Sequence, residues 1–420
     1  MKDDRLNITR PLLTASILLA LTGTVTGQNL RSQHYADYKF GMFVTWGPYS
    51  VASVEASWPI MKGSWYGKLS EEDYRRLPER FNPAKFDPRA WVRLAKQAGQ
   101  RYMVFTTKHH DGFCMFDSQF TDYKITNTPY KRDVLKMLAD ACKEEGLPLG
   151  FYYSPPDMNH PSYRDTSKSP HENFRGEPWR PEWPLFLAYM ELQLRELLTQ
   201  YGEVEVLWFD GLGGKGYDPV RMERVIHELQ PRTLLNNRLG IPGDFDTPEQ
   251  KVPGKMPERL WETCMTINGT WAYNENDHRF KSSEMLIRTL VEIVSKGGNL
   301  LLNVGPTPEG EIQPEFVERL RDIGQWLTLN GEAIYGADAG PLQNVAWGRT
   351  TQQGKNLYLH VFEWPKRQLS VQGLKRKVSQ VVLLAGAQPL KFQQTGDELA
   401  IELPAQAPDI RVSVISVETQ

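Results

Sequence analysis

An aspartate at the end of an apolar run is the residue of this sequence best suited to nucleophilic chemistry. Residues 206–209 read Val-Leu-Trp-Phe, and Asp210 and Gly211 follow directly. A carboxylate held at the end of a rigid strand can attack an electrophilic carbon, such as the anomeric carbon of a sugar. The alternative interpretation is that Asp210 caps a helix or ends the strand in a turn.

Further polar and aromatic side chains follow the other apolar runs. They are Thr45-Trp46, His109-His110, Asp157, Trp208, Arg238, Glu249, Glu262 and Asn303. No Ser or Cys has an obvious base beside it, so the set favours paired carboxylates over acyl transfer. Trp46, Trp65, Trp208 and Trp271 are either stacking walls for a sugar or part of the core.

The adjacent residues His109 and His110 suggest hydrogen bonds to sugar hydroxyls. If the backbone is extended there, one side chain points into the site and the other points sideways. A metal site is less well supported, because no third ligand stands at a recognised spacing. We therefore expect neither a metal nor a cofactor, and buried histidines that bond only to backbone remain the alternative.

Seven short apolar runs alternate with helical patterns between residues 38 and 335. The expected strands are Phe40–Trp46, Arg101–Thr107, Pro148–Tyr153, Val204–Phe209, Thr233–Asn237, Arg259–Cys264 and Asn299–Val304. Continuous apolar runs are typical of parallel strands that are buried on both faces. The pattern predicts an α/β fold, a (β/α)8-like barrel with one strand missed or degenerate, whose strand ends converge on one mouth. An open doubly wound sheet is the alternative, although no GxGxxG or GxxxxGK[ST] motif follows a strand.

Helix signals between the runs support this alternation. One predicted helix has Asp87 as N-cap and Pro88 in its first turn, and it ends at Gly99. A second is expected over residues 283–295. After residue 338 helical patterns stop, and Asn356–Phe362, Val378–Leu384, Glu398–Leu403 and Ile410–Val417 predict a C-terminal antiparallel β-sandwich. We therefore divide the chain into a signal peptide (1–27), a catalytic barrel (28–338) and a sandwich (339–420).

The overall charge does not favour a polyanionic partner. Lys and Arg number 49 against 51 Asp and Glu, so we expect no attraction to nucleic acid or to anionic membranes. The sequence holds 3 cysteines, an odd and sparse set that indicates neither a disulfide framework nor structural zinc.

The N-terminus has the pattern of an export signal. Lys2, Arg5 and Arg10 precede an apolar run over residues 11–21, and small residues follow at Val25 and Gly27. A membrane anchor is the alternative, but the run is shorter than the roughly 20 residues that span a bilayer. We expect cleavage of the signal and a periplasmic or extracellular protein that has no membrane attachment afterwards.

A set of motifs in fixed order resembles glycoside hydrolase family 29, the retaining α-L-fucosidases. The matching stretches are residues 39–43, 65–66, 108–113, 208–211, 237–238, 247–249, 261–264, 271–273 and 298–306. The resemblance implies a glycan substrate and a double displacement through a covalent glycosyl-enzyme. It implies that Asp210 is the nucleophile, that His109 and His110 bind sugar hydroxyls, that Trp208 lines the pocket and that Arg238 binds substrate beside the nucleophile.

The acid/base residue is harder to assign. Glu249, in the loop Asp-Thr-Pro-Glu, is the first choice on the resemblance, and Glu262, at the expected end of its strand, is the second. Retention requires the two carboxyl groups to lie about 5–5.5 Å apart.

Two departures from the family pattern concern the sugar pocket. Thr45 stands where such enzymes usually have His, and Ser64 stands where they usually have Glu before the Trp65-Tyr66 pair. Fewer hydrogen-bonding partners should weaken binding of the usual sugar. The alternatives are therefore an α-L-galactosidase or modified-fucose hydrolase of the same fold, and a non-catalytic carbohydrate-binding protein. The aglycone, the linkage preference and the oligomeric state stay open.

Overall fold

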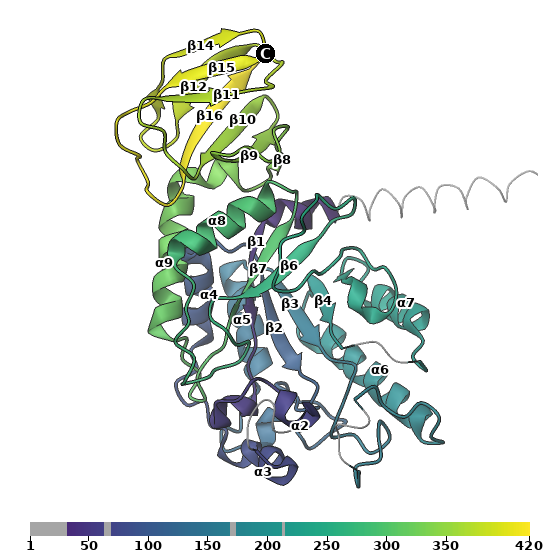
Figure 1. Cartoon of the computed structure of the whole chain (residues 1–420). Helices are drawn as coiled ribbons and strands as arrows, with labels where there is room; N and C mark the ends of the chain where they lie inside the picture. The colour runs from purple at the N-terminus through teal and green to yellow at the C-terminus, as the bar shows by residue number, and fades with distance from the viewer. Residues whose placement is uncertain (1–31, 63–68, 169–173, 212–214) are drawn as a thin grey trace, which may run out of the picture.

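The protein consists of a parallel β-sheet surrounded by helices and a C-terminal pair of antiparallel sheets (Figure 1). The computed structural model describes residues 32–62, 69–168, 174–211 and 215–420. The predicted signal peptide, Ser64 and Trp65 lie outside the described residues.

The parallel sheet has seven strands, all aligned in one direction. They are β1 (Phe40–Val44), β2 (Met103–Lys108), β3 (Leu149–Tyr153), β4 (Val206–Phe209), β5 (Leu234–Leu235), β6 (Glu262–Thr266) and β7 (Asn299–Val304). Their order is β5-β4-β3-β2-β1-β7-β6, which confirms the predicted (β/α)8-like architecture. The strand expected over Arg259–Cys264 was placed too early, because β6 begins only at Glu262.

An irregular segment takes the place of the eighth strand, between β5 and β6. Phe245 makes a parallel bridge to Asn236 beyond β5, and Asp246 makes another to Trp261 before β6. The same segment ends at Glu249, which bridges Cys264 in β6. The degenerate strand therefore closes the barrel and carries a candidate catalytic carboxylate.

Helices cover the outside of the sheet and follow the sequence signals. The main ones are α4 (Pro88–Gln97), α5 (Val134–Glu145), α6 (Trp183–Gln200), α7 (Pro219–Leu229), α8 (Ser283–Val294) and α9 (Pro314–Asn330). Asp87 caps α4 by accepting a hydrogen bond from the Ala90 N–H at 3.0 Å, as predicted. Shorter turns of helix are η1 (Pro48–Ala52), α2 (Trp58–Lys62), α3 (Glu71–Arg75), η3 (Leu77–Arg80), η4 (Ile125–Asn127), η6 (Asn237–Leu239) and η7 (Gly331–Ala333).

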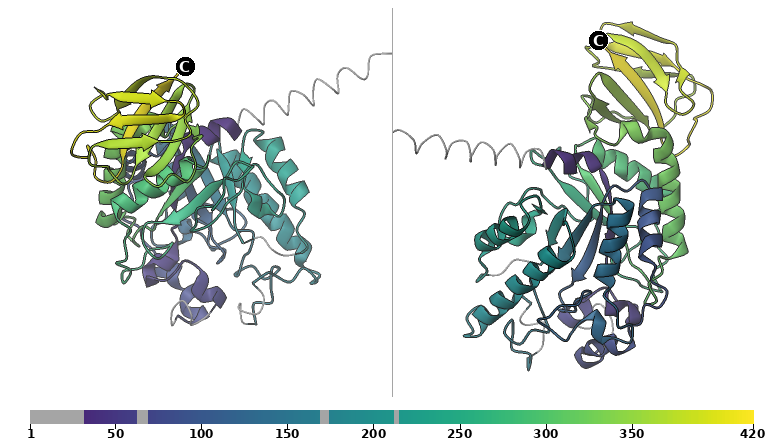
Figure 2. Two further views of the ribbon diagram at one scale, coloured as in Figure 1. Left: turned by 45° about the horizontal axis from the view of Figure 1, so that its top comes forward. Right: turned by 180° about the vertical axis from the view of Figure 1, so that it is seen from behind.

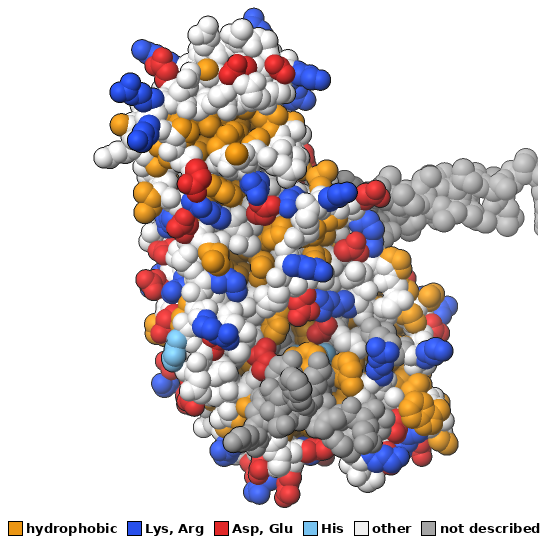
Figure 3. Space-filling view, viewed as in Figure 1, with side chains coloured by type: hydrophobic (Ala, Val, Ile, Leu, Met, Phe, Trp, Pro, Cys, Tyr) orange, Lys and Arg blue, Asp and Glu red, His pale blue; other side chains and the backbone are white. Residues whose placement is uncertain are grey.

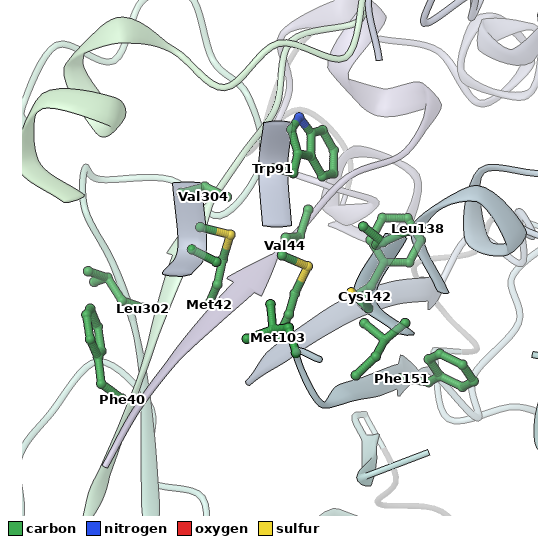
Figure 4. Packing of buried hydrophobic residues seen from close by; sticks show 14 of the residues in the cluster. Phe40, Met42, Val44, Trp91, Met103, Leu138, Cys142, Phe151, Leu302 and Val304 are labelled. Atoms are coloured by element: carbon green, nitrogen blue, oxygen red, sulfur yellow. The ribbon is translucent and has the colours of Figure 1, made fainter. Parts of the chain in front are cut away.

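Side chains alternate between two layers along each barrel strand. In β1, Met42 and Val44 face outward and pack with Trp91 of α4 and Leu138 of α5 (Figure 4). Phe43 belongs instead to the cluster that fills the barrel interior. This two-residue period decides which predicted site residues can reach the mouth.

The C-terminal part is a sandwich of two antiparallel sheets, as predicted. One sheet has the order β13-β12-β16-β10-β9-β8 and the other β11-β15-β14. The strands are β8 (Asp338–Ala339), β9 (Gly348–Gln353), β10 (Asn356–Val361), β11 (Gln368–Val371), β12 (Val378–Leu383), β13 (Gln388–Pro389), β14 (Phe392–Thr395), β15 (Glu398–Glu402) and β16 (Ser413–Thr419). The sequence prediction missed the short or polar strands, such as β9 and β14, because they lack an apolar run.

The sandwich rests on α8 and α9 of the barrel (Figure 2). Trp326 of α9 donates its indole N–H to the Val412 carbonyl at 2.9 Å, and Arg288 of α8 donates to the Phe362 carbonyl at 2.8 Å. Acidic and basic side chains are interspersed on the face in Figure 3, in keeping with the formal net charge of −2. Among the described helices, none is both long and apolar enough to span a bilayer.

Candidate active site

A pocket at the carboxyl ends of the barrel strands collects most of the predicted site residues. It is lined by Phe43, Thr45, Trp58, His109, His110, Tyr152, Trp208, Asp210, Arg238, Glu249, Cys264 and Trp271. These residues come from segments spread over more than 200 positions of the sequence, and only the barrel topology brings them together.

Asp210 lies directly after β4 and receives hydrogen bonds on both carboxylate oxygens. Arg238 Nη1 and the Gly211 N–H donate to Oδ1 at 2.7 and 2.9 Å. The Tyr152 hydroxyl donates to Oδ2 at 2.9 Å, and His110 Nε2 lies 3.6 Å from the same oxygen. The carboxylate is thus held in one orientation at the pocket wall.

These neighbours keep Asp210 ionised. Burial is the largest single effect and raises its pKa. The charges of Arg238 and His110, together with the hydrogen bonds from Arg238 and Tyr152, outweigh burial and lower the pKa to about 2. A nucleophilic carboxylate needs this state, because only the anion has the reactive lone pair.

Arg238 joins the two carboxylates predicted to do the chemistry. Its Nη1 binds Asp210, and its Nη2 binds Glu249 Oε2 at 3.0 Å. Thr247 fixes the other side of the guanidinium through its hydroxyl, which accepts from Nε at 2.9 Å. The guanidinium carbon also lies 4.6 Å from the centre of the Trp208 ring, a cation–π contact. One rigid planar group therefore sets the spacing of Asp210 and Glu249.

Glu249 is positioned by β6 although it lies in a loop. Its neighbours pair with the strand, since the Cys264 N–H donates to the Pro248 carbonyl at 3.3 Å and the Gln250 N–H donates to the Cys264 carbonyl at 2.9 Å. Its side chain is 45% exposed, so solvent and a leaving group can reach it. Both properties suit an acid/base.

Glu262 does not line this pocket. It stands at the start of β6 instead of the expected strand end, and its carboxylate is fully buried. Tyr35 and Tyr102 donate their hydroxyls to Oε2, and the Trp208 indole N–H donates to Oε1 at 3.0 Å. Burial raises the pKa of Glu262, against the effect of these donors. Its contacts assign it to the support of Trp208.

Both predicted histidines line the pocket, whereas alternation along an extended strand predicted only one. The difference arises because β2 ends at Lys108 and the chain turns at His110. His109 stacks on Tyr152 with ring centres 5.4 Å apart, and its Nδ1 is hydrogen-bonded to the Ser57 hydroxyl. Burial lowers the pKa of His109 well below its ordinary range, so the ring is neutral.

The tautomer of His110 follows from its neighbours. Ser154 Oγ donates to the Pro156 carbonyl at 2.9 Å, so His110 Nδ1 must donate to Ser154 Oγ, at 2.6 Å. Burial lowers the pKa of His110 to about 4, although Asp210 opposes this shift. Its Nε2 therefore carries a lone pair beside Asp210, suited to accept a hydrogen bond from a hydroxyl group.

Trp46, a candidate stacking wall in the sequence, belongs to the core and does not line the pocket. It is fully buried in the layer between sheet and helices, where its ring packs edge-on against Trp91 at 5.1 Å. Its indole N–H donates to the Thr307 carbonyl at 3.0 Å. Thr45 does line the pocket: its N–H extends the pairing of β1 with β7 by one residue, and the alternation of the strand directs it to the side opposite Val44.

The sequence prediction missed Phe43, Trp58, Tyr152 and Cys264 as pocket residues. Phe43 and Tyr152 are interior positions of β1 and β3, and the two-residue period could have identified them. Trp58 follows a non-repetitive stretch after β1, and its ring meets His110 edge-on at 5.7 Å. No sequence signal indicated that contact.

Within the described parts of the chain, no group of three or more His, Cys, Asp or Glu side chains is arranged to hold a metal ion. The pocket offers instead an ionised carboxylate, a second carboxylate open to solvent, neutral imidazoles and aromatic walls. Such a set suits displacement at a sugar carbon with proton transfer by the second carboxylate.

Comparison with known proteins agrees with this geometry. The sequence profile of the family described as "Alpha-L-fucosidase" matches residues 22–332. The plasma alpha-L-fucosidase of Homo sapiens is 31% identical over 409 residues, covering 87% of this chain and 84% of the human protein.

Two solved structures show the same fold. Alpha-L-fucosidase isoenzyme 1 from Paenibacillus thiaminolyticus has a TM-score of 0.88 and 38% identity, over 94% of this chain and 100% of that one. A family 29 alpha-L-fucosidase from Bacteroides thetaiotaomicron, solved as a trapped covalent intermediate, has a TM-score of 0.82 and 29% identity, over 92% and 95% of the two chains. This chain belongs to the α-L-fucosidase family of glycoside hydrolases, family 29.

Proposed function

We propose that the protein is an exported retaining exo-glycosidase that releases terminal α-L-fucosyl or closely related residues from glycans. The observation that carries the proposal is the guanidinium of Arg238, which binds the ionised Asp210 on one side and the accessible Glu249 on the other. The covalent intermediate described for the Bacteroides relative supports a double displacement.

In the first step Asp210 attacks the anomeric carbon. Oδ1 already receives two hydrogen bonds and Oδ2 receives one, so we assign the attack to Oδ2. As the new C–O ester bond forms, the glycosidic C–O bond breaks, and Glu249 donates a proton to the departing oxygen. His110 Nε2 accepts a hydrogen bond from a sugar hydroxyl in this assignment.

In the second step Glu249 acts as the base. It removes a proton from water, whose oxygen attacks the same carbon and displaces Asp210 as a carboxylate. Two inversions give net retention, and Glu249 ends protonated, ready for the next cycle.

The direct test is hydrolysis of an aryl α-L-fucoside followed by proton NMR. We expect the α-anomer of fucose to form first and to mutarotate later. We also expect Asp210→Gly to lose several orders of magnitude in kcat, with partial rescue by azide that yields the β-fucosyl azide. Initial release of the β-anomer, or a near-normal kcat for Asp210→Gly, would exclude this mechanism.

A modified glycone is the second candidate, and the position of Thr45 favours it. The Thr45 hydroxyl donates to Asn303 Oδ1 at 2.7 Å, so it is already committed within the protein. We expect weak activity on simple fucosides and better activity on L-galactosides or substituted fucosides in an aryl glycoside panel. A kcat/KM on the simple fucoside on the order of 10⁴ M⁻¹s⁻¹ or more would exclude this variant of the proposal.

Export rests on the N-terminal pattern alone, and we propose a periplasmic or extracellular location. Cell fractionation combined with N-terminal sequencing of the mature protein tests it. Cleavage near residue 27 is expected, and an intact N-terminus in the cytosolic fraction would contradict it.

A further inference from the structure

The backbone of Trp271, which forms a wall of the pocket, is held in place by Glu55, Asn303 and Gly305. We call this set of contacts the grip. Its N–H donates to both carboxylate oxygens of Glu55, at 2.9 and 3.0 Å. Its carbonyl accepts a hydrogen bond from Asn303 Nδ2 at 2.7 Å. Gly305 lies directly beneath, since a Cβ there would come within 2.8 Å of the same carbonyl oxygen. Only glycine permits this approach.

The grip extends through Asn303 to Thr45, which also lines the pocket. The Thr45 hydroxyl donates to Asn303 Oδ1, which leaves the Nδ2 of that amide directed at Trp271. Thr45 directly follows β1 and donates its N–H to the Val304 carbonyl at 3.1 Å, while Asn303 lies in β7, the parallel neighbour of β1, so this end of the grip is rigid. The other end of the grip is formed by Glu55, which lies in a loop.

The loop that carries Glu55 also contacts the two histidines. Ser57 is hydrogen-bonded to His109 Nδ1, and the ring of Trp58 meets the ring of His110 edge-on. Residues 55–58 therefore touch three different walls of the pocket. A segment with these contacts can set the shape of the sugar site without taking part in bond making.

We propose that Glu55 is a positioning residue for the glycone pocket, acting by holding the backbone of Trp271 against Asn303 and Gly305. The inference rests on the proposed function in one respect only, that the pocket binds the sugar. It assigns to Glu55 a role in substrate fit and none in proton transfer.

The protonation of Glu55 gives the grip a pH dependence. Burial, with smaller contributions from the charges of Asp277 and Glu249, raises the pKa of Glu55 to about 7, against the opposing effect of the N–H groups of Trp271 and Ala272. Above that pH both oxygens accept from Trp271. Below it one oxygen carries a proton, and the grip loosens as the pH falls through about 7.

The test combines amide hydrogen exchange with steady-state kinetics on the full-length protein. In Glu55→Ala at pH 8, exchange of the Trp271 amide should be about ten- to hundredfold faster, the range for loss of a hydrogen bond to a charged group. KM for an aryl α-L-fucoside should rise roughly tenfold, with kcat changed less than threefold. Glu55→Gln keeps one oxygen acceptor, so its KM should rise less than the KM of Glu55→Ala. Because an amide does not titrate, KM should no longer depend on pH near 7.

Glu275→Gln is the matched control, because it removes a negative charge from an exposed position four residues after Trp271. It should leave exchange and KM unchanged. If Glu55→Ala does not fold, Thr45→Val releases the other end of the grip and should also accelerate exchange at Trp271.

Unchanged exchange in the folded variants, or an equal effect in the control, would overturn the proposal. A fall in kcat with normal exchange would overturn it as well, since Glu55 would then serve proton transfer. If the wild type cleaves no fucoside, the proposed function fails, while the exchange measurement still tests the grip.

Discussion

At the residue scale, the charge of Arg238 decides the state of the nucleophile. Asp210 is largely buried, and a buried carboxyl without a partner would take up a proton at higher pH. The same guanidinium binds Glu249, so a change at Arg238 reaches both carboxylates. The dependence of kcat/KM on pH is therefore a sensitive measure of the contact between Arg238 and Asp210.

Replacement of Arg238 by Met should move the acid limb of activity to higher pH. The pKa of Asp210 is lowered to about 2 in the wild type, so Asp210 stays ionised until the pH falls toward 2. Without the cation its pKa should rise by roughly 1–3 units, and kcat/KM should begin to fall at correspondingly higher pH. Initial rates on an aryl fucoside from pH 3 to 8 measure this. Arg224→Met, at an exposed position of α7, is the control, and an unshifted limb in Arg238→Met would refute the argument.

The two candidate acid/base glutamates should differ in which substrates they affect. Glu249→Ala should spare an activated aryl glycoside far more than a natural disaccharide, because only a poor leaving group needs protonation. Glu262→Leu should show no such dependence. It should lower the free energy of unfolding by about 3 kcal/mol or more, since three buried donors lose their acceptor. Leaving-group dependence in Glu262→Leu alone would reverse the assignment.

At the scale of elements, the irregular segment between β5 and β6 replaces the eighth barrel strand and also carries the candidate acid/base Glu249. Gln250, directly after Glu249, has a left-handed backbone with φ 54°, which few residues other than glycine adopt without cost. Its Nε2 donates to Thr266 Oγ1 at 3.1 Å. Local strain at this point is thus offset by bonds to β6, and the direction of Glu249 depends on both.

Gln250→Val should disturb the segment more than it disturbs the barrel. A β-branched residue in a left-handed conformation costs about 1–2 kcal/mol, and the bond to Thr266 is lost as well. We expect a drop of about 2 kcal/mol in the free energy of unfolding and a lower kcat on unactivated glycosides. Denaturant titration and kinetics measure both. Gln250→Gly, which accepts this φ, should recover most of the stability, and equal losses in both variants would argue against backbone strain.

At the scale of the whole molecule, the barrel and the sandwich share a continuous core. Tyr358 of β10 and Val414 of β16 pack with barrel residues such as Trp326. Leu357 and Leu359 face the other way and fill the sandwich. Because successive residues of β10 serve different cores, the two parts should unfold together.

His360 makes the stability of this barrel–sandwich contact depend on pH. Its Nε2 donates to the Thr351 hydroxyl at 2.8 Å, because that hydroxyl itself donates to the Ala333 carbonyl. Burial lowers the pKa of His360 to about 3. Between pH 6.5 and 3 the unfolded chain therefore binds a proton that the folded protein does not, and stability falls as the pH falls.

His360→Gln should flatten this dependence. A single histidine contributes at most about 1.4 kcal/mol per pH unit, and the slope of the free energy of unfolding between pH 6 and 4 should decrease by about that amount. His109 and His110, whose pKa values are also lowered, contribute in the same direction in both proteins. His278→Gln, at an exposed position, should keep the wild-type slope. An unchanged slope in His360→Gln would show that protonation of His360 does not affect the stability of the protein.

The sequence alone determined the barrel, the sandwich and the strand that ends at Asp210. Apolar runs, N-caps such as Asp87 and the change of pattern after residue 338 are local signals, and burial of apolar side chains converts them directly into elements. The order of motifs likewise pointed to the family and to the residues that line the pocket from strand ends. These features depend on residues that are close together in the sequence.

Only the tertiary structure decided what each side chain faces. Trp46 and Thr45 are neighbours in sequence, yet the strand period directs Trp46 into the outer core and Thr45 into the pocket. Glu262 and Glu249 are both acidic residues near β6, and a shift of the strand start places one beneath Trp208 and the other at the mouth. The contact of Glu55 with Trp271 joins loops 216 positions apart. Such choices follow from register and from packing between distant segments, and no local pattern of residues encodes them.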